Sequence, residues 1–135
     1  MRLRESVEVA RPPDEVYAVL TAPEQRETGG AWRELARDEG GYRAKLHLPG
    51  LVDLDFDCRF ELEERTGRAV VVRGMGTSSR LGFTFAGNLF VRGTGQTSTV
   101  DADVEVLPAG SLAGLGQRRV REEARRLIAE FVAPR

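Results

Sequence analysis

The chain has 135 residues, of which 41% are hydrophobic and 30% are charged, and its formal net charge is −1. These values are typical of a folded domain, and the near-neutral charge argues against a dedicated nucleic-acid binder, which needs surplus basic residues. The single cysteine, Cys58, excludes an internal disulfide and favours the cytoplasm. No apolar run reaches the roughly 18 residues of a membrane-spanning helix, and the first residues do not resemble a secretory signal. We therefore expect one soluble cytoplasmic domain covering residues 1–135.

The first part of the chain predicts one strand followed by two short helices. Residues 3–9 alternate between apolar and polar side chains, which is typical of a strand with one buried face. Pro12 and Pro13 end this strand and suit the first turn of a helix. A second short helix is expected to begin at Ala22 and to end at Gly29, because glycine pairs interrupt helices.

Period-two alternation from Trp32 onward predicts six further strands joined by turns. The third of these is the clearest, since Phe56, Cys58 and Phe60 alternate with charged residues, as in an antiparallel sheet with one wet face. The expected strands cover residues 32–37, 42–48, 54–63, 70–76, 83–91 and 100–106.

The turn around Gly67 decides which face of the following strand is buried. A three-residue loop with this glycine in the left-handed conformation would pair Glu64 with Arg68 and turn Val72 inward. A two-residue loop would instead bury Arg73, and a buried arginine without an acidic partner is costly. We therefore expect the three-residue loop, with Arg73 in solvent.

The last segment, residues 111–132, is the only long stretch with a helical period. Ser111 is the expected N-cap of this helix, after a turn that contains Pro108 and Gly110. Its apolar residues recur every three or four positions and so define one face: Leu112, Gly116, Val120, Ala124, Leu127, Ile128 and Phe131. The elements together predict an α+β fold in which a curved antiparallel sheet wraps around this helix.

Residues that commonly carry catalysis or bind metals are scarce. His47 is the only histidine and falls on the charged face of its strand, which excludes a multi-histidine metal site and gives a histidine-based triad little support. Cys58 falls on the apolar face, where cysteine usually acts as a small hydrophobe. The aspartates at 53, 55 and 57 share the charged face, which favours a solvated stripe over a calcium site. No motif indicates a cofactor or a metal.

Five arginines lie on the polar face of the last helix, and two interpretations stay open. In the first, the face is solvated and stitched by the pairs Arg118–Glu122, Glu122–Arg126 and Arg126–Glu130. In the second, the face formed by Arg118, Arg119 and Arg126 contacts an acidic partner protein or an anionic membrane. The interleaved glutamates weaken the positive field and favour the first interpretation.

Several segments resemble a known superfamily. The opening strand followed by PPDEVYAVLTAPE, residues 12–24, is similar to the start of START-like proteins, also called SRPBCC or helix-grip proteins. The SLAGLGQR segment at 111–118, with Gly74, Gly76 and the TSTV segment at 97–100, resembles the branch formed by the G subunits of carbon monoxide dehydrogenases. This resemblance implies a helix-grip fold, in which a seven-stranded curved antiparallel sheet grips the long helix around a hydrophobic tunnel.

The resemblance also implies a range of functions. Superfamily members bind lipids, sterols, polyketides, quinones and other apolar molecules, and a minority are cyclases or hydrolases. The carbon monoxide dehydrogenase branch is associated with molybdenum hydroxylase systems, in assembly, membrane recruitment or quinone handling. This chain has Gly29-Gly30 where the branch typically has Pro-Gly, and it stops at Arg135 without the long tail of many members. We therefore do not expect recruitment to a membrane by such a tail.

Our leading expectation is a non-catalytic protein that binds a lipid, quinone or polyketide-like molecule between the sheet and the last helix. It would be an accessory protein of a molybdenum hydroxylase or carbon monoxide dehydrogenase-type system. A polar contact to the ligand would come from Tyr42, from Cys58 or from a polar residue at the mouth. The residues expected around the ligand share the inner face of the sheet or the apolar face of the helix: Tyr42, Leu46, Phe56, Phe60, Val72, Phe83, Phe85, Leu89, Val120, Leu127 and Phe131.

Two alternatives remain. One is a cyclase- or aromatase-type enzyme in which Tyr42, or an acidic residue near the mouth, acts as general acid or base. A side chain of Glu5, Glu34 or Arg73 facing the cavity would support this alternative. The other is an assembly factor that docks on a partner enzyme through the arginine face of the last helix.

Overall fold

A computed structural model describes residues 1–25, 30–48, 55–79, 81–110, 114 and 116–133. Within these ranges the order is one strand, a helical segment, six strands and a final helix, as the sequence predicts. The elements are β1 (Arg2–Val9), α1 (Pro13–Thr21), the 3-10 turn η1 (Pro23–Gln25), β2 (Trp32–Asp38), β3 (Gly41–His47), β4 (Asp55–Arg65), β5 (Ala69–Ser78), β6 (Leu81–Arg92), β7 (Ser98–Gly110) and α2 (Gln117–Val132).

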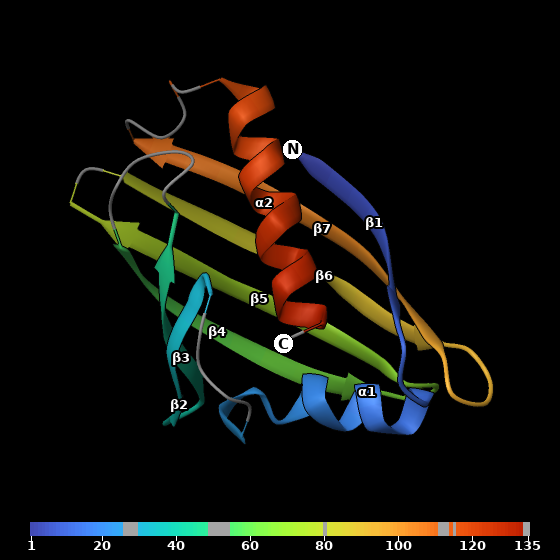
Figure 1. The fold of residues 1–135 in the computed structure, drawn as a ribbon. Helices are drawn as coiled ribbons and strands as arrows, with labels where there is room; N and C mark the ends of the chain where they lie inside the picture. The colour runs from blue at the N-terminus through green and yellow to red at the C-terminus, as the bar shows by residue number, and fades with distance from the viewer. Residues whose placement is uncertain (26–29, 49–54, 80, 111–113, 115, 134–135) are drawn as a thin grey trace.

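The seven strands form one antiparallel sheet in the order β1-β7-β6-β5-β4-β3-β2. Consecutive strands from β2 to β7 pair with each other, and β1 pairs with β7 at the far edge. Figure 1 shows that the sheet curves around α2, which lies across its inner face, while α1 lies at the end where α2 stops. The predicted α+β fold, with a curved sheet around the C-terminal helix, is confirmed.

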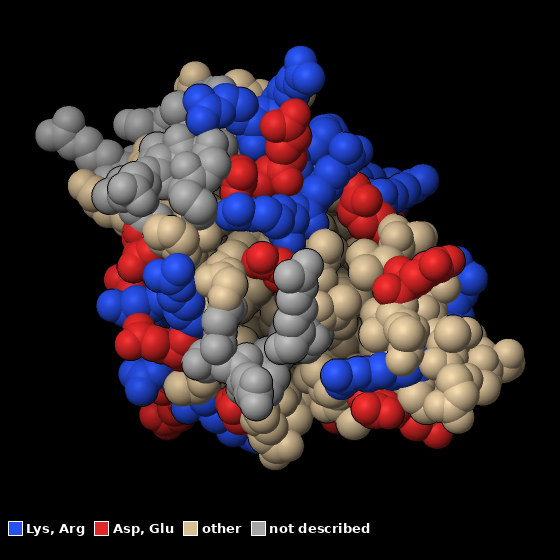
Figure 2. All heavy atoms as spheres, in the orientation of Figure 1, with Lys and Arg blue, Asp and Glu red and all other residues tan. Residues whose placement is uncertain are grey.

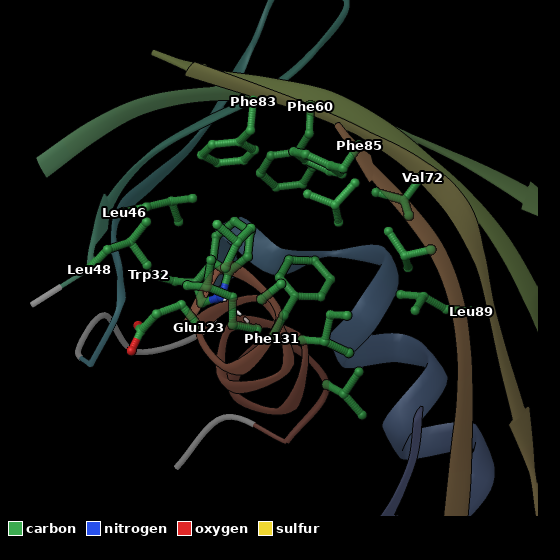
Figure 3. A pocket seen from close by; sticks show the side chains of 17 residues that line it. Trp32, Leu46, Leu48, Phe60, Val72, Phe83, Phe85, Leu89, Glu123 and Phe131 are labelled. Atoms are coloured by element: carbon green, nitrogen blue, oxygen red, sulfur yellow. Dashed lines mark hydrogen bonds between the residues drawn. The ribbon is translucent and has the colours of Figure 1, made fainter. Parts of the chain in front are cut away.

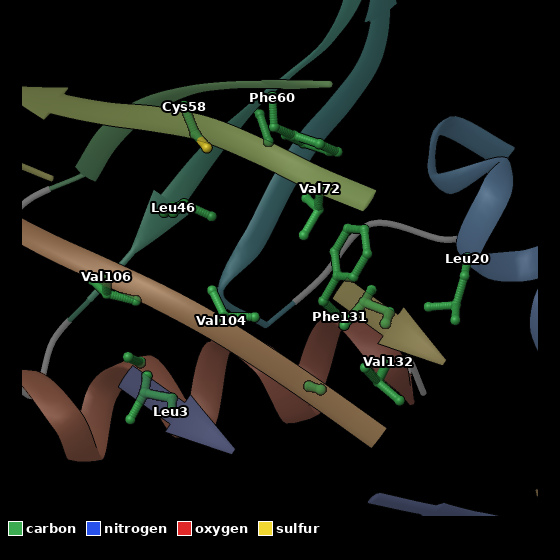
Figure 4. Close-up of a cluster of buried hydrophobic side chains, with 14 of the residues drawn as sticks. Leu3, Leu20, Leu46, Cys58, Phe60, Val72, Val104, Val106, Phe131 and Val132 are labelled. Atoms are coloured by element: carbon green, nitrogen blue, oxygen red, sulfur yellow. The ribbon is translucent and has the colours of Figure 1, made fainter. Parts of the chain in front are cut away.

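The hydrophobic core lies between the inner face of the sheet and the two helices (Figure 4). Alternation on β4 buries Phe56, Cys58 and Phe60, while the residues between them are exposed. Helix α1 adds Val16 and Leu20. Helical spacing places the buried residues of α2 on one face, and they are Val120, Ala124, Phe131 and Val132.

The boundary between β7 and α2 differs from the prediction. Helix α2 begins at Gln117, with Gly116 in the left-handed region at φ 93°, whereas Ser111 lies outside the described residues. Pro108 and Gly110 do not form a turn, because β7 stays paired with β6 as far as Gly110. The backbone N–H of Val106 donates to the carbonyl oxygen of Met1, just before β1. The nitrogen of Pro108, two residues on, points to the same side of β7 but lies beyond the residues that pair with β1. A proline is tolerated there because no ladder hydrogen bond is lost.

The expected second short helix is only one 3-10 turn, η1, in the described residues. Pro23 explains the break after α1, because a proline disfavours helical backbone at the preceding residue, here Ala22 at φ −134° and ψ 60°. Thr21 also closes the last turn of α1, since its hydroxyl donates to the carbonyl oxygen of Tyr17 at 3.0 Å.

The hairpin between β4 and β5 has the predicted faces but a different pairing. Its three-residue loop is one position later than expected, so Arg65 pairs with Ala69, and Leu62 pairs with Val72 instead of Val70. Both Gly67 (φ 78°) and the residue after it have left-handed backbone. A shift of two residues keeps every side chain on its face, since the side-chain period of a strand is two.

Candidate apolar ligand site

A cavity of about 100 Å³ lies between the inner face of the sheet and α2, and it is partly open to solvent (Figure 3). Its walls come from every strand except β1, and its floor comes from α2. The side chains that line it are Trp32, Leu46, Leu48, Phe60, Val72, Phe83, Phe85, Leu89, Val104, Val106, Val120, Glu123, Ala124, Leu127, Ile128, Phe131 and Val132. Almost all are aliphatic or aromatic, which is the lining that apolar ligands need.

An aromatic cluster closes one side of the cavity. The ring of Phe60 on β4 lies 5.8 Å from that of Trp32 on β2 and 5.8 Å from that of Phe131 on α2, with edge-to-face geometry in both pairs. The rings of Trp32 and Phe131 are 4.9 Å apart. These contacts tie α2 to the sheet without filling the space beyond the cluster.

Glycines on β5 explain why that space stays empty. Gly74 lies beside the side chains of Phe60 and Phe85, and a Cβ atom placed on it would come within 2.6 Å of both. Gly76 lies in the same way under the ring of Phe83. The rings of Phe83 and Phe85 on β6 therefore pack against the backbone of these two glycines of β5, and do not extend toward α2.

Two hydrogen bonds hold the second half of α2 against the start of β2. The indole N–H of Trp32 donates to the carbonyl oxygen of Leu127 at 2.9 Å. The backbone N–H of Ala31 donates to Glu130 Oε2 at 3.1 Å. The one donor on the ring of Trp32 is therefore already used, and Glu123, the charged residue of the described lining, is paired with Arg126 at 2.8 Å.

The structure places the predicted site residues around this cavity, except for Tyr42 and Phe56. The ring of Tyr42 stacks on the outer side of Phe60 at 5.3 Å, and its hydroxyl donates to the carbonyl oxygen of Thr21 at 3.4 Å. Phe56 is fully buried and packs against Phe83 at 5.6 Å, away from the cavity lining. That the remaining nine residues contact a ligand stays a prediction.

The family follows from a comparison with known proteins. A model of the family described as the G subunit of carbon monoxide dehydrogenase (CoxG) matches residues 6–134. The chain belongs to the CoxG family. No curated protein sequence matches it.

Several solved structures share this fold at low sequence identity. A conserved protein from Geobacillus kaustophilus superposes with a TM-score of 0.80 at 16% identity, over 97% of this chain and 90% of that one. A START superfamily protein from Mycobacterium smegmatis gives 0.61 at 12% identity, over 97% and 90%. The Zhui aromatase/cyclase from Streptomyces sp. R1128 gives 0.61 at 19% identity, over 97% and 86%. These similarities confirm the helix-grip fold.

Sequence reasoning missed several lining residues of this CoxG-family chain, and Glu123 is the most informative. It lies three positions after Val120 and four before Leu127, so helical spacing alone places it on the cavity face of α2. Ala124, Ile128 and Val132 follow from the same spacing. Trp32 could not be placed this way, because its strand contains an irregularity.

Neither residue named as a source of polar contact reaches the cavity. Cys58 is 1% exposed and lies outside the lining, and burial raises the pKa of its thiol to about 12, so it is an inert hydrophobe as predicted. Tyr42 also lies outside the lining, and burial raises the pKa of its hydroxyl. The third source, a polar residue at the mouth, stays a prediction.

The three side chains that would have supported catalysis, Glu5, Glu34 and Arg73, lie outside the cavity lining. Glu5 forms an ion pair with Arg125 on α2, with 2.6 Å between Oε1 and Nε. Glu34 has left-handed backbone at φ 52° within the bulge between Arg33 and Ala36, and its side chain is exposed. Arg73 is exposed on the outer face of β5, as predicted.

The outer face carries the charged residues that the sequence places there. His47 Nδ1 lies 2.8 Å from Asp55 Oδ1, across the β3–β4 pair, whereas Asp53 lies outside the described residues. Among the residues that the structure describes, no group of His, Cys, Asp and Glu side chains could hold a metal ion. None of the described helices is long and apolar enough to cross a membrane.

The polar face of α2 agrees in part with the first interpretation, a solvated face on which arginines and glutamates form ion pairs. Figure 2 shows basic side chains gathered over the start of α2 with acidic ones among them. The predicted Arg118–Glu122 pair is present at 3.3 Å. Arg126 instead pairs with Glu123 at 2.8 Å, and Glu130 accepts a hydrogen bond from the backbone N–H of Ala31, just before β2, so the other two predicted pairs are replaced.

Proposed function

We propose that this CoxG-family chain binds an apolar small molecule, or the apolar part of a larger one, between the sheet and α2. The observation that carries the proposal is a partly open void with an almost entirely apolar lining. Protein interiors are close-packed and contain few voids larger than a water molecule, so a void of this size is unusual. A ligand that fills it would gain about 25 cal/mol for each Å² of apolar surface removed from water.

The size of the void limits what it holds without rearrangement. A cavity of about 100 Å³ is smaller than the roughly 150 Å³ that accommodates benzene in an engineered protein, and well below the roughly 300–1,000 Å³ of most ligand sites. We therefore expect it to take one ring or a few methylenes directly. A lipid, quinone or polyketide would extend through the opening or displace α2, whose contacts with β2 are two hydrogen bonds and an aromatic cluster.

Native mass spectrometry of the purified chain, followed by organic extraction of any adduct, tests this proposal. Ala124 lines the cavity on α2, so Ala124→Leu places additional carbons in the void and is expected to remove the adduct. Ala129 lies on the same helix outside the lining, so Ala129→Leu is the matched control and should keep it. An adduct that survives Ala124→Leu, or a failure of the wild-type chain to bind any of a panel of quinones, fatty acids and alkylbenzenes, would contradict the proposal.

The family supports a second proposal, an accessory role toward a carbon monoxide dehydrogenase-type enzyme. Arg118 and Arg119 are exposed at the start of α2 and would provide the docking face, whereas Arg126 is turned toward Glu123. Reversing both charges, Arg118→Glu with Arg119→Glu, is expected to abolish co-purification with the enzyme from the same source. Unchanged co-purification would argue against this face.

Binding is proposed here in preference to cyclase-type catalysis. Glu5, Glu34 and Arg73 do not line the cavity, and neither does Tyr42. General acid–base catalysis requires a group within hydrogen-bond reach of the reacting atom. Glu123 lies in the lining, but its carboxylate is paired with Arg126 at 2.8 Å.

A further inference from the structure

The outer face of the sheet carries an exposed apolar row. Among the described residues, the large hydrophobic side chains that are exposed are Met75 on β5, Phe90 on β6 and Leu107 on β7. Each lies between buried residues of its strand, so all three point away from α2. The strand register places Thr84 of β6 directly between Met75 and Leu107, which makes these three residues one continuous row. Exposed apolar side chains that gather on neighbouring strands, unlike single ones, indicate a surface that contacts a partner.

The next row of the same face alternates in charge. Cross-strand pairing aligns five exposed residues from β4 to β1, in the order Glu61, Arg73, Ala86, Glu105 and Arg2. The first residue is negative and the last positive, the second is positive and the fourth negative, and the middle one is uncharged. Reversing the row therefore places an opposite charge against every charged residue. Such a row is complementary to a second copy of itself.

The charges of this row are accessible to a partner. Neither Glu61 nor Arg73 forms an ion pair with another residue that the structure describes. Glu105 lies 2.9 Å from the N-terminal amine and Arg2 lies 2.6 Å from Asp103, but the side chains of Glu105 and Arg2 are 48% and 58% exposed. All four charged side chains can thus be approached from solvent.

We propose that the outer face binds a second copy of this chain, with the two-fold axis of the dimer lying along β6. This axis reverses the strand order, so β5 packs over β7 of the partner subunit and β4 over its β1. Met75 then contacts Leu107 of the partner subunit, and Arg73 faces Glu105 of the partner subunit. Ala86, with its small side chain, lies at the axis. Both contacts occur twice, because a two-fold axis brings the same patch of both subunits together.

The curvature of the sheet limits the size of this contact. Figure 1 shows the sheet curving around α2, so its outer face is convex and a partner meets the middle strands before the edges. We therefore expect a contact smaller than the roughly 1,600 Å² of a standard interface, and an association that is weak and depends on concentration. The cavity opens on the inner side of the sheet, so this proposal is independent of the ligand proposed above.

Sedimentation equilibrium of two charge-reversal variants, alone and mixed, tests the proposal. Arg73→Glu makes both charge contacts of the dimer repulsive, because each then joins two acidic side chains, and Glu105→Arg does the same with two basic ones. Like charges placed together at an interface are costly, so each variant alone should dimerise at least ten-fold more weakly than the wild-type chain. An equimolar mixture should recover the wild-type average mass, because the acidic group introduced at position 73 faces the basic group introduced at position 105.

The matched control is Arg118→Glu, which reverses an exposed charge on α2, away from the outer face of the sheet. This variant should dimerise like the wild-type chain, and circular dichroism checks that all three substitutions leave the fold intact. A wild-type chain that stays monomeric up to millimolar concentration would overturn the proposal, and so would a dimer that neither Arg73→Glu nor Glu105→Arg weakens. Folded variants that remain monomeric when mixed would also overturn it, because Arg73 and Glu105 would then not face each other.

Discussion

Two phenylalanines on the same face of β4 have different surroundings. Phe56 is fully buried, packs against Phe83 and does not line the cavity. Phe60, four residues on, contacts aromatic rings from β2 and α2 and has empty space beside it. The inner face of this sheet is therefore divided into a packed region and an open region. Alternation determines which side chains face inward, but the neighbours across the strands determine whether the interior is filled.

The packed region should be the most sensitive to loss of volume. Phe56→Ala removes a ring that is 0% exposed, and truncations of this kind cost about 3–5 kcal/mol of the free energy of unfolding. Urea denaturation followed by circular dichroism measures this change. A loss below about 1 kcal/mol would show that the region around Phe56 is not packed as described.

Substitutions that add side-chain volume should change the free energy of unfolding differently in the packed region and in the open region. Ala102 on β7 is 3% exposed and does not line the cavity, so Ala102→Leu overpacks the core and should lower the free energy of unfolding by roughly 1–3 kcal/mol. Ala124 lines the void, so Ala124→Leu should leave the free energy of unfolding, measured in the same urea titration, unchanged or raise it. Equal losses in the two variants would mean that the space beside α2 is not available.

The contact between the open region and α2 should depend on the indole N–H of Trp32. Trp32→Phe keeps an aromatic ring but loses the hydrogen bond to Leu127, which predicts a loss of about 1 kcal/mol in the free energy of unfolding. Tyr42→Phe is the comparison variant, because it loses a longer hydrogen bond, 3.4 Å, outside the cavity. The smaller loss is expected for Tyr42→Phe, and the reverse order would contradict this role for Trp32.

The smallest effect is expected on the wet outer face, where a small stabilisation at neutral pH should be lost in acid. Hydrogen bonds from Arg92 and then Ser6 hold the pKa of Asp101 below its ordinary value of 3.8. A carboxylate with a lowered folded-state pKa stabilises the protein above its unfolded pKa and loses this contribution as the pH falls through the folded one. The stability difference between the wild-type chain and Asp101→Asn should therefore be present at pH 7, begin to decline below pH 3.8, and be lost as the pH falls through the lower folded-state pKa. A difference that persists in acid would point to packing in place of charge.

The faces of the strands and of α2 could be predicted from the sequence, because they depend on periods of two and 3.6 residues. Phe60, Val72 and Leu127 were placed at the cavity for this reason. The position of Tyr42 could not be predicted, because it depends on how the β2–β3 hairpin bends toward Thr21. Glu34 would have supported catalysis had it faced the cavity, but it lies in the bulge of β2 and is exposed.

Long-range pairing limited the remaining predictions. The extension of β7 through Pro108 depends on where β1 begins, which lies far earlier in the chain. The void depends on which rings of β6 lie over Gly74 and Gly76 of β5. Glu123 was accessible from helical spacing, and it was missed because only apolar residues were assigned to that face of α2.

The most direct test of the central claim is the structure of crystals pressurised with xenon. Xenon binds dry apolar cavities without requiring any particular functional group, so it reports whether the space itself exists. We predict a xenon atom between Phe60, Phe85 and Leu127 in the wild-type chain and none there in Ala124→Leu. A wild-type crystal in which xenon is absent from this position, with the side chains closed over it, would contradict the account.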